Sequence, residues 1–184
     1  SLKSANKVVI VSSTIISPSM NEAILKLGSS IGSDKIEHIQ YDAMSYNALR
    51  QAQAGLFGVD AVPSYDFSKA EVIVSIGADF LNNWLTNTKI EAEYSDLRRP
   101  ERGTQSKHYQ FESAMTMTGT NADVRTTVNP SDEGNLAAGL LAAVNGSSVS
   151  NLDEKISARV KEAAKSLVGA RGKSIVLAGT NDLA

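Results

Sequence analysis

The chain has 184 residues, of which 42% are hydrophobic and 21% are charged, and it contains no cysteine. These proportions are typical of a globular domain with a hydrophobic core. The lack of cysteine excludes disulfides, thiolate zinc sites and cysteine-held iron–sulfur clusters from these residues. The net charge of -2 argues against nucleic acid as a partner. No apolar run approaches the roughly 20 residues that a membrane-spanning helix needs, so we expect no direct membrane span.

The chain begins by alternating between strand and helix patterns. Residues 7–13 (KVVIVSS) form an apolar, β-branched run that predicts a strand buried on both faces. A helix cap at Ser17 then opens a helical pattern, for which Gly28 and Gly32 are the possible stops. Strict alternation predicts a second strand at 36–41, and an alanine- and glutamine-rich pattern predicts a helix at 43–56.

The middle of the chain continues this alternation with a longer loop. Residues 71–76 (EVIVSI) are the second strongly apolar strand. A long polar region follows, with one short helix predicted near 84–93. Strands are predicted at 109–112 and 124–128, joined by a turn at 118–121.

The last third adds two helices and a strand. A cap at 129–131 opens a helix whose apolar stripe ends at Val144. The polar stretch 146–151 (GSSVSN) is the clearest linker. A regular amphipathic helix is predicted at 156–167, and a buried type of strand at 173–178.

Apolar strands separated by amphipathic helices predict an α/β fold. We expect a three-layer, Rossmann-like domain with a mainly parallel sheet and helices on both faces. We assign residues 1–146 to this domain. Residues 147–184 are then a linker, helix and strand that pack on the same sheet or begin another βα unit.

Ligands of such sheets bind beyond the carboxyl ends of the strands. The segments to consider are therefore 12–17, 77–83, 112–118 and 179–182. Neither G-x-G-x-x-G nor the P-loop pattern occurs in the sequence. The hydroxyls at 12–14 could hold an anion beside a helix N-terminus, although ordinary capping is favoured. Residues 28–32 match the nucleophile pattern G-x-S-x-G, but helix precedes strand there, so we interpret them as the end of a helix.

The histidines and the strand-end acids admit both functional and structural interpretations. His38 and His108 lie in different predicted strands, and zinc needs three or four converging ligands, so packing is favoured for both. The sequence thus predicts no metal ligand set and no catalytic residue. Glu112 and Glu133 could accept hydrogen bonds from a guanine or a ribose, although a structural role is favoured for both. For Asp123 a structural role is strongly favoured.

A basic cluster and the single tryptophan stay open at this stage. Residues 98–102 (RRPER) are either a solvated loop or a docking site for another subunit. Trp84, in the same long loop, either anchors that loop to the core or faces a partner.

Several short sequence segments follow one another in a characteristic order along nearly the whole chain. The longest is YDFSKAEVIVSIGADFL at 65–81. The others are ISPS at 16–19, YDAMSY at 41–46, FES at 111–113, TMTG at 116–119, NADVR at 121–125 and VNPSDE at 128–133. Together they resemble molybdopterin-oxidoreductase-like proteins, in particular the TAT-variant-translocated branch that forms the large iron–sulfur subunit of bacterial alternative complex III.

The resemblance implies a part of a larger electron-transfer assembly. Catalytic members of the wider family use this domain to help hold a molybdopterin guanine dinucleotide. In the resembled branch the molybdopterin-like half carries no cofactor, and iron–sulfur clusters lie in a separate ferredoxin-like half. We therefore expect no cofactor here. The implied partners are that half and other subunits of a membrane respiratory complex, on the periplasmic side of the bacterial inner membrane.

The sequence departs from the family pattern at the nucleotide pocket. Where catalytic members have G-x-N, this chain has Gly77 followed by Asp79, so an amide has become an anion. An Asp-Pro-Arg type of sequence is replaced by Glu112 and Ser113. The P-G-T-D sequence before a helix is replaced by PSDE at 130–133, so the glycine is lost and the last residue is the longer acid Glu133. These five residues are the candidates for a vestigial pocket.

Three functions are therefore carried forward. The first is a non-catalytic scaffold and docking domain in a quinol-oxidising respiratory complex. The alternative is a molybdopterin guanine dinucleotide-binding domain of an active molybdenum oxidoreductase. The third is an unrelated small-molecule enzyme on a Rossmann-like sheet, whose signature would be a deep pocket at the strand ends with a paired acid and base.

Overall fold

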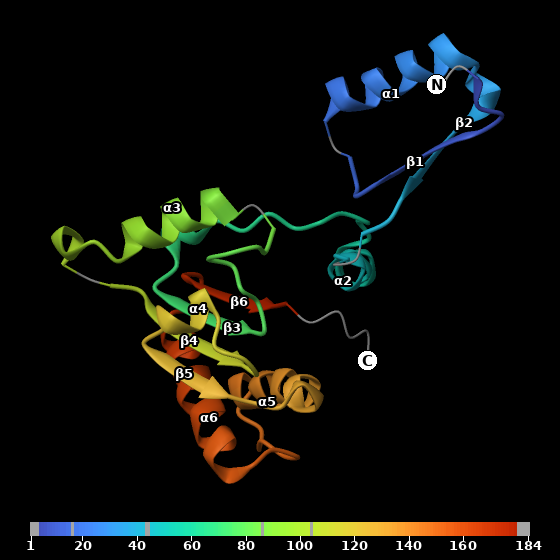
Figure 1. Cartoon of the computed structure of the whole chain (residues 1–184). Coiled ribbons are helices and arrows are strands. Elements are labelled where there is room, and N and C mark those ends of the chain that lie inside the picture. Colours follow the sequence, from blue (N-terminus) through green and yellow to red (C-terminus); the bar gives the residue numbers. More distant parts are fainter. Residues whose placement is uncertain (1–3, 16, 43–44, 86, 104, 180–184) are drawn as a thin grey trace. The chain divides into compact units, whose positions relative to one another are not determined.

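The computed structural model describes residues 4–15, 17–42, 45–85, 87–103 and 105–179 (Figure 1). The chain forms two compact units, Ser1–Tyr46 and Asn47–Ala184. The polar GSSVSN stretch had instead predicted a division at residue 146. The last strand, β6 (Ser174–Ala178), pairs in parallel with β3 (Val72–Ile76), which ties the residues that follow this stretch to the second unit.

The first unit is a β-α-β element. β1 (Val8–Ser12) and β2 (Ile36–Gln40) pair in parallel, and α1 (Pro18–Ile31) lies between them in sequence. Ser17 caps α1 through its side chain, and Gly32 ends it with a φ of 108°. The G-x-S-x-G pattern is therefore the end of a helix, as predicted.

β1 is not buried on both faces, which corrects the prediction for residues 7–13. Val9 is 46% exposed and Val11 is 69% exposed. Two paired strands with one helix between them provide cover for a single face at most, and an apolar run predicts two-sided burial only when a second layer is present.

The second unit contains most of the secondary structure. In chain order, its helices and strands are α2 (Asn47–Phe57), β3, α3 (Asn87–Leu97), β4 (Lys107–Glu112), α4 (Met117–Thr120), β5 (Val124–Thr127), α5 (Glu133–Val144), α6 (Glu154–Gly169) and β6. Single 3₁₀ turns lie at Phe67–Lys69, Pro100–Arg102 and Pro130–Asp132. The strand order is β5-β4-β3-β6, with parallel pairing throughout.

The sheet of the second unit is covered on both faces. Successive residues of a strand face opposite layers. Val74 and Tyr109 pack with Leu136 of α5 and Val160 of α6 in the main apolar cluster. On the other face, His108 of β4 contacts Tyr94 of α3 edge to face, with ring centroids 5.6 Å apart. The unit is therefore a three-layer α/β domain with a parallel sheet, which confirms the predicted Rossmann-like fold (Figure 1).

Several elements differ from their predicted bounds. α3 begins at Asn87 and reaches Leu97, further along than the helix predicted at 84–93. The predicted turn at 118–121 is largely the short helix α4, because β4 and β5 run parallel and need a connection that crosses back over the sheet. The predicted start of α2 at 43–44 lies outside the described residues. No helix in the described ranges is both long and apolar enough to cross a membrane.

The long loop after β3 is anchored by aromatic packing. Trp84 is 6% exposed and stacks on Tyr65 at a centroid distance of 5.6 Å. Phe80 is fully buried and lies 5.1 Å from the ring of Phe67. Of the two roles considered for Trp84, the structure therefore supports the anchor.

A close backbone approach makes Gly179 indispensable. A β-carbon at this position would lie 2.5 Å from the Cα of Ala78 and 2.7 Å from the carbonyl oxygen of Gly77. We expect Gly179→Ala to lower the free energy of unfolding by about 2 to 3 kcal/mol, because main-chain atoms cannot move aside cheaply. Gly134→Ala on α5 is the control, since no atom lies within 4 Å of its added carbon. That variant should lose nothing in urea unfolding, and equal losses in both would contradict the packing argument.

Candidate functional site

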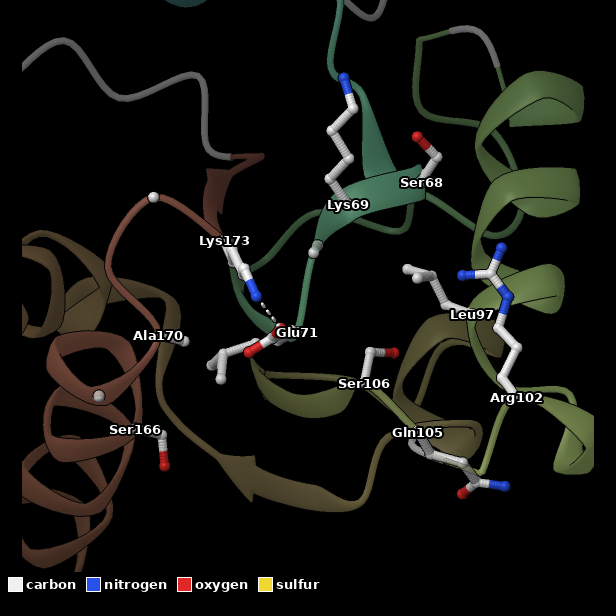
Figure 2. Close-up of a pocket in the computed structure, with 14 residues that line it drawn as sticks. Ser68, Lys69, Glu71, Leu97, Arg102, Gln105, Ser106, Ser166, Ala170 and Lys173 are labelled. Atoms are coloured by element: carbon white, nitrogen blue, oxygen red, sulfur yellow. Dashed lines mark hydrogen bonds and ion pairs between the residues drawn. The ribbon is translucent and has the colours of Figure 1, made fainter.

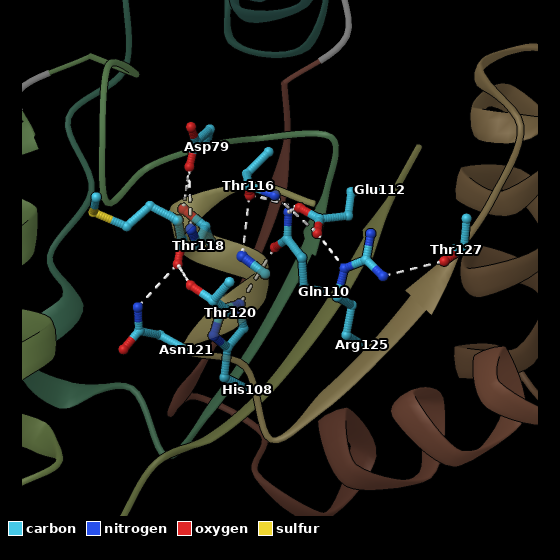
Figure 3. A network of polar contacts seen from close by, with 12 residues as sticks. Asp79, His108, Gln110, Glu112, Thr116, Thr118, Thr120, Asn121, Arg125 and Thr127 are labelled. Atoms are coloured by element: carbon cyan, nitrogen blue, oxygen red, sulfur yellow. Dashed lines mark hydrogen bonds and ion pairs between the residues drawn. The ribbon is translucent and has the colours of Figure 1, made fainter. Parts of the chain in front are cut away.

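Polar side chains gather at the carboxyl ends of β3 and β4, where ligands of parallel sheets bind. The strand β4 explains how they become buried. Its residues His108, Gln110 and Glu112 share one face and are at most 2% exposed, while Tyr109 and Phe111 face the apolar cluster. The carboxyl-edge network consists of this polar face of β4 together with Asp79, Thr116, Thr118, Asn121, Arg125 and Thr127 (Figure 3).

Glu112 is the most fully engaged member of the carboxyl-edge network. Its carboxylate accepts hydrogen bonds from the Thr116 hydroxyl at 2.6 Å and from the Gln110 amide at 3.2 Å. The Nε of Arg125 on β5 donates to it at 2.5 Å. Burial acts to raise the pKa of Glu112, but the hydrogen bonds from Thr116, Arg125 and Gln110 outweigh it, and the pKa lies below its ordinary value. The side chain is therefore an anion held by groups of its own chain.

Glu112 also explains the glycine of helix α4. A β-carbon at Gly119 would lie 1.8 Å from Oε1 of Glu112. The Gly119 amide donates to the hydroxyl of Thr116, which caps α4 and also donates to Glu112. The short helix is thus fastened directly on top of the buried carboxylate.

Asp79 holds the other side of α4. It accepts hydrogen bonds from the backbone amide of Thr118 at 3.2 Å and from the Thr118 hydroxyl at 2.8 Å. Asn82 donates to its second oxygen at 3.0 Å. Burial acts to raise the pKa of Asp79, but the hydrogen bonds from Asn82 and Thr118 outweigh it and the pKa is lowered.

Glu133 and Gly77 come together from separate elements. Gly77 follows β3 with a φ of +64°, and its amide donates to the carbonyl oxygen of Phe111 at 2.8 Å. Glu133 is the first residue of α5, and a β-carbon on Gly77 would lie 3.1 Å from its Oε1. The carboxylate therefore covers the glycine turn where a phosphate would approach a Rossmann-like sheet.

The structure brings together four of the five predicted residues in two groups. Asp79 and Glu112 converge on α4, while Gly77 and Glu133 meet beside it. Ser113 is exposed and follows β4 in the loop before α4.

The network also contains four residues that were not predicted from the sequence: Gln110, Thr116, Thr118 and Arg125. Alternation of polar residues in HYQFE, followed by T-x-T, was the available signal. Strand alternation predicts which residues share a face, but it does not predict that the polar face is the buried one.

A buried chain of hydrogen bonds extends from Glu112 to α3. Burial lowers the pKa of His108 to about 4, so the imidazole is neutral at pH 7. Its Nε2 lies 3.3 Å from Oε1 of Gln110, and its Nδ1 lies 3.1 Å from the hydroxyl of Tyr94. An amide oxygen only accepts, so Nε2 carries the proton and Nδ1 is an acceptor. The single proton of the Tyr94 hydroxyl is shared between Nδ1 and the backbone carbonyl oxygen of Asn121, which lies 3.0 Å from the hydroxyl. Burial also raises the pKa of Tyr94 to about 12.

The remaining candidates have structural contacts. Asp123 accepts two hydrogen bonds from Arg98 at 2.7 and 2.9 Å and one from the His108 amide at 2.7 Å, so it has the structural role expected for it. Arg99 and Arg102 both pair with Asp96. The basic cluster at 98–102 is therefore neutralised by acids of its own unit.

The serine and histidine candidates of the first unit are also engaged. Ser12 lies 2.8 Å from Nε2 of His38. Thr14 donates its amide and its hydroxyl to Asp42. Of the segment predicted at 179–182, only Gly179 belongs to the described residues.

A pocket of about 790 Å³ lies at the opposite, amino edge of the sheet (Figure 2). It is lined by residues such as Val72 at the start of β3 and Ser106 before β4. Its Lys173 pairs with Glu71 at 2.7 Å. None of the five predicted site residues lines it, so it does not supply the acid and base at the strand carboxyl ends that the small-molecule enzyme required.

The pair of Glu112 and Arg125 should be a strong contributor to stability. Glu112 is 2% exposed and the Arg125 side chain 23% exposed. Arg125→Met should lower the free energy of unfolding by about 3 kcal/mol, because it leaves a buried carboxylate without its cation. The surface pair of Arg102 and Asp96 is the control, and Arg102→Met should cost less than about 1 kcal/mol. Similar losses in chemical denaturation would contradict the assignment, whereas adding Glu112→Gln to Arg125→Met should restore part of the loss.

Acid should destabilise the chain through His108. Its folded pKa of about 4 lies below the ordinary value of 6.5, so the unfolded chain binds the proton more tightly. Stability is full above pH 6.5 and falls by about 2 kcal/mol between pH 7 and pH 5. His108→Gln should flatten this part of the stability profile. The acids with lowered pKa values affect stability only at lower pH. An NMR titration that gives His108 a pKa near 6.5 would contradict the prediction.

Comparison with known proteins adds no relative. The chain matches no protein-family model, and no curated protein is similar to it. In the described part of the chain, no cluster of three or more histidine, aspartate or glutamate side chains is arranged to hold a metal ion. The geometry of the carboxyl edge is therefore the main guide to function.

Proposed function

We propose that this chain is a non-catalytic scaffold and docking domain of a molybdopterin-oxidoreductase-like subunit. The parent would belong to a quinol-oxidising respiratory complex on the periplasmic side of the bacterial inner membrane. The sequence segments between residues 16 and 133, taken in their order along the chain, support this proposal because they resemble that branch. The three-layer α/β fold is compatible with it.

One observation carries the proposal: side chains of the chain itself occupy the carboxyl edge of the sheet, where a ligand would bind. Asp79 and Glu112 are engaged by hydrogen bonds from α4, and Glu133 lies over Gly77. A pyrophosphate needs free amide donors and positive potential at the glycine turn. Here the Gly77 amide is used by Phe111, and the nearest charge is the carboxylate of Glu133.

Electrostatics oppose a dinucleotide in the same place. Asp79 and Glu112 have lowered pKa values and are ionised at neutral pH. A pyrophosphate brought beside them would meet like charges, which costs several kcal/mol. The internal contacts therefore favour an architectural role over the alternative of a guanine dinucleotide-binding domain.

Exposed apolar residues supply surfaces for the proposed docking role. Leu56 and Phe57 at the end of α2 are 77% and 69% exposed, and Val59 just beyond them is 55% exposed. Single exposed apolar residues are ordinary, but a contiguous group is typical of an interaction surface. The proposed partners are the ferredoxin-like half of the parent protein and other subunits of the complex.

Titration with GDP tests the filled edge. We expect no saturable heat in calorimetry and no rise in melting temperature at millimolar GDP, because the Gly77 amide is already engaged and the neighbouring carboxylates repel a phosphate. Glu133→Gln is the matched variant, since it keeps the side chain and removes its charge. Saturable binding to the natural sequence that weakens in Glu112→Gln would support the dinucleotide-binding alternative instead.

The respiratory assignment has its own measurement. The full-length natural protein, solubilised from its membranes, should co-purify with haem-bearing subunits in one complex. Its molybdenum content should be far below one atom per chain. A stoichiometric pterin dinucleotide and molybdenum would overturn the non-catalytic role, and a pure protein without haem or membrane partners would overturn the complex.

A further inference from the structure

The cations of the chain are concentrated on α6 and the turn that follows it. Residues 153–173 hold six of the 18 lysines and arginines of the chain but only three of its 20 acids. Two of these acids, Asp153 and Glu154, stand at the start of α6, where the helix dipole favours negative charge. A chain whose net charge is -2 therefore carries one distinctly basic segment and an acidic remainder.

The helix α6 divides its side chains between the core and the solvent. Val160 and Leu167 belong to the main apolar cluster. The basic face consists of five exposed side chains, four on the helix and one just after it: Lys155, Arg159, Lys161, Lys165 and Arg171. Residues four apart lie one above the other on a helix, so the four members on α6 form two neighbouring rows that together span about 15 Å.

Four cations of the basic face make no ion pair within the described residues. Arg159 is the exception, because it pairs with Glu162 at 2.8 Å. Lys107 of β4 shares the same carboxylate at 3.3 Å, so Glu162 is already engaged by two cations. Outside the described ranges the sequence contains a single acid, Asp182, and one carboxylate does not neutralise four cations. The charge of the face is thus not balanced by its own chain.

Exposed apolar side chains adjoin the basic face. The helices α5 and α6 pack against each other on one side of the sheet (Figure 1). Leu141 of α5 is 64% exposed, Val168 of α6 is 41% exposed, and both line a groove together with Arg171. Val168 lies on the same side of α6 as Lys161 and Lys165, seven and three residues earlier. Cations beside exposed apolar side chains form the combination that binds at a lipid–water interface.

We propose that the basic face of α6 binds a membrane surface rich in anionic phospholipids. Each cation held near such a surface strengthens binding about fivefold. The attraction acts over about 8 Å in physiological salt, so acids of the chain that lie farther from the lipid oppose it little. This inference is independent of the proposed function.

The chemistry of the basic face favours lipid over other anionic partners. Three of its four unpaired cations are lysines, which are mobile point charges, whereas arginine is the usual choice for ion pairs with a protein partner. The phosphate backbone of a nucleic acid offers no apolar layer to Leu141 and Val168. The first unit is not complementary in charge either, because residues 1–46 contain four lysines and four acids.

Co-sedimentation with vesicles tests the proposal. The chain should sediment with vesicles of equal parts phosphatidylglycerol and phosphatidylcholine in 0.1 M salt, and it should stay in solution with phosphatidylcholine alone. Salt at 1 M should release it, because the range of the attraction then falls to about 3 Å.

Paired substitutions locate the binding surface. Lys161→Gln combined with Lys165→Gln should weaken vesicle binding about 25-fold, at about fivefold for each charge. Lys89→Gln combined with Arg99→Gln is the matched control, because it removes the same charge from exposed positions at α3, on the opposite face of the sheet. The control should bind as the natural chain does. Both variants change exposed side chains and should keep the natural circular dichroism spectrum.

A further variant separates lipid from other anions. Leu141→Ser should weaken vesicle binding at least about fivefold, since it removes an exposed apolar side chain that the interface would bury. It should leave any weak binding to polyglutamate or to duplex DNA unchanged.

Three results would overturn the proposal. One is vesicle binding that does not depend on phosphatidylglycerol, or no binding at all. Another is an equal loss in the α6 and α3 double variants, because net charge and not the basic face would then be responsible. The third is binding to polyglutamate or duplex DNA as tight as binding to the vesicles, which would make the face a site for acidic proteins or nucleic acid.

Discussion

A carboxylate buried at the end of β4 organises the carboxyl edge of the second unit. Glu112 is 2% exposed and can be an anion there because Thr116, Gln110 and Arg125 surround it with donors. Each donor comes from a different position: the start of α4, the strand itself and the neighbouring strand. Loss of this side chain would remove the acceptor of all three contacts together, so the position of α4 depends on it. The glycine at 119 is needed because no other residue leaves room for the carboxylate.

The same strand separates two kinds of interior. Tyr109 and Phe111 enter the apolar cluster with α5 and α6, while His108 and Gln110 continue the polar face. A buried polar group is tolerated only when it is hydrogen-bonded. The chain from Glu112 through Gln110 and His108 to Tyr94 meets this requirement, and burial keeps the imidazole neutral in its middle.

The contacts around Glu112 and Glu133 bear on function because they lie at the carboxyl edge of the sheet. In a Rossmann-like sheet the carboxyl edge offers donors to a phosphate. Here the edge is occupied by acids and hydroxyls that bind one another, and α5 begins with the carboxylate of Glu133 beside Gly77. Apolar exposure instead lies elsewhere, near Leu56 on α2 and along β6. Surfaces of that kind suit association with proteins better than the binding of a charged small molecule.

The sequence by itself determined the alternation of strands and helices, the parallel sheet and the caps at Ser17 and Gly32. These follow from local patterns, because periodicity and cap chemistry act within a few residues. It also identified Asp79 and Glu112 as strand-end acids, whereas Glu133, which was grouped with them, begins helix α5. Only the tertiary structure decided that Thr116, Thr118 and Arg125 would meet them, because those contacts join residues on different elements. It also decided that the division between units lies near residue 46 and that β1 is not buried on both of its faces. Burial depends on which elements pack against a strand, and a local pattern does not contain that information.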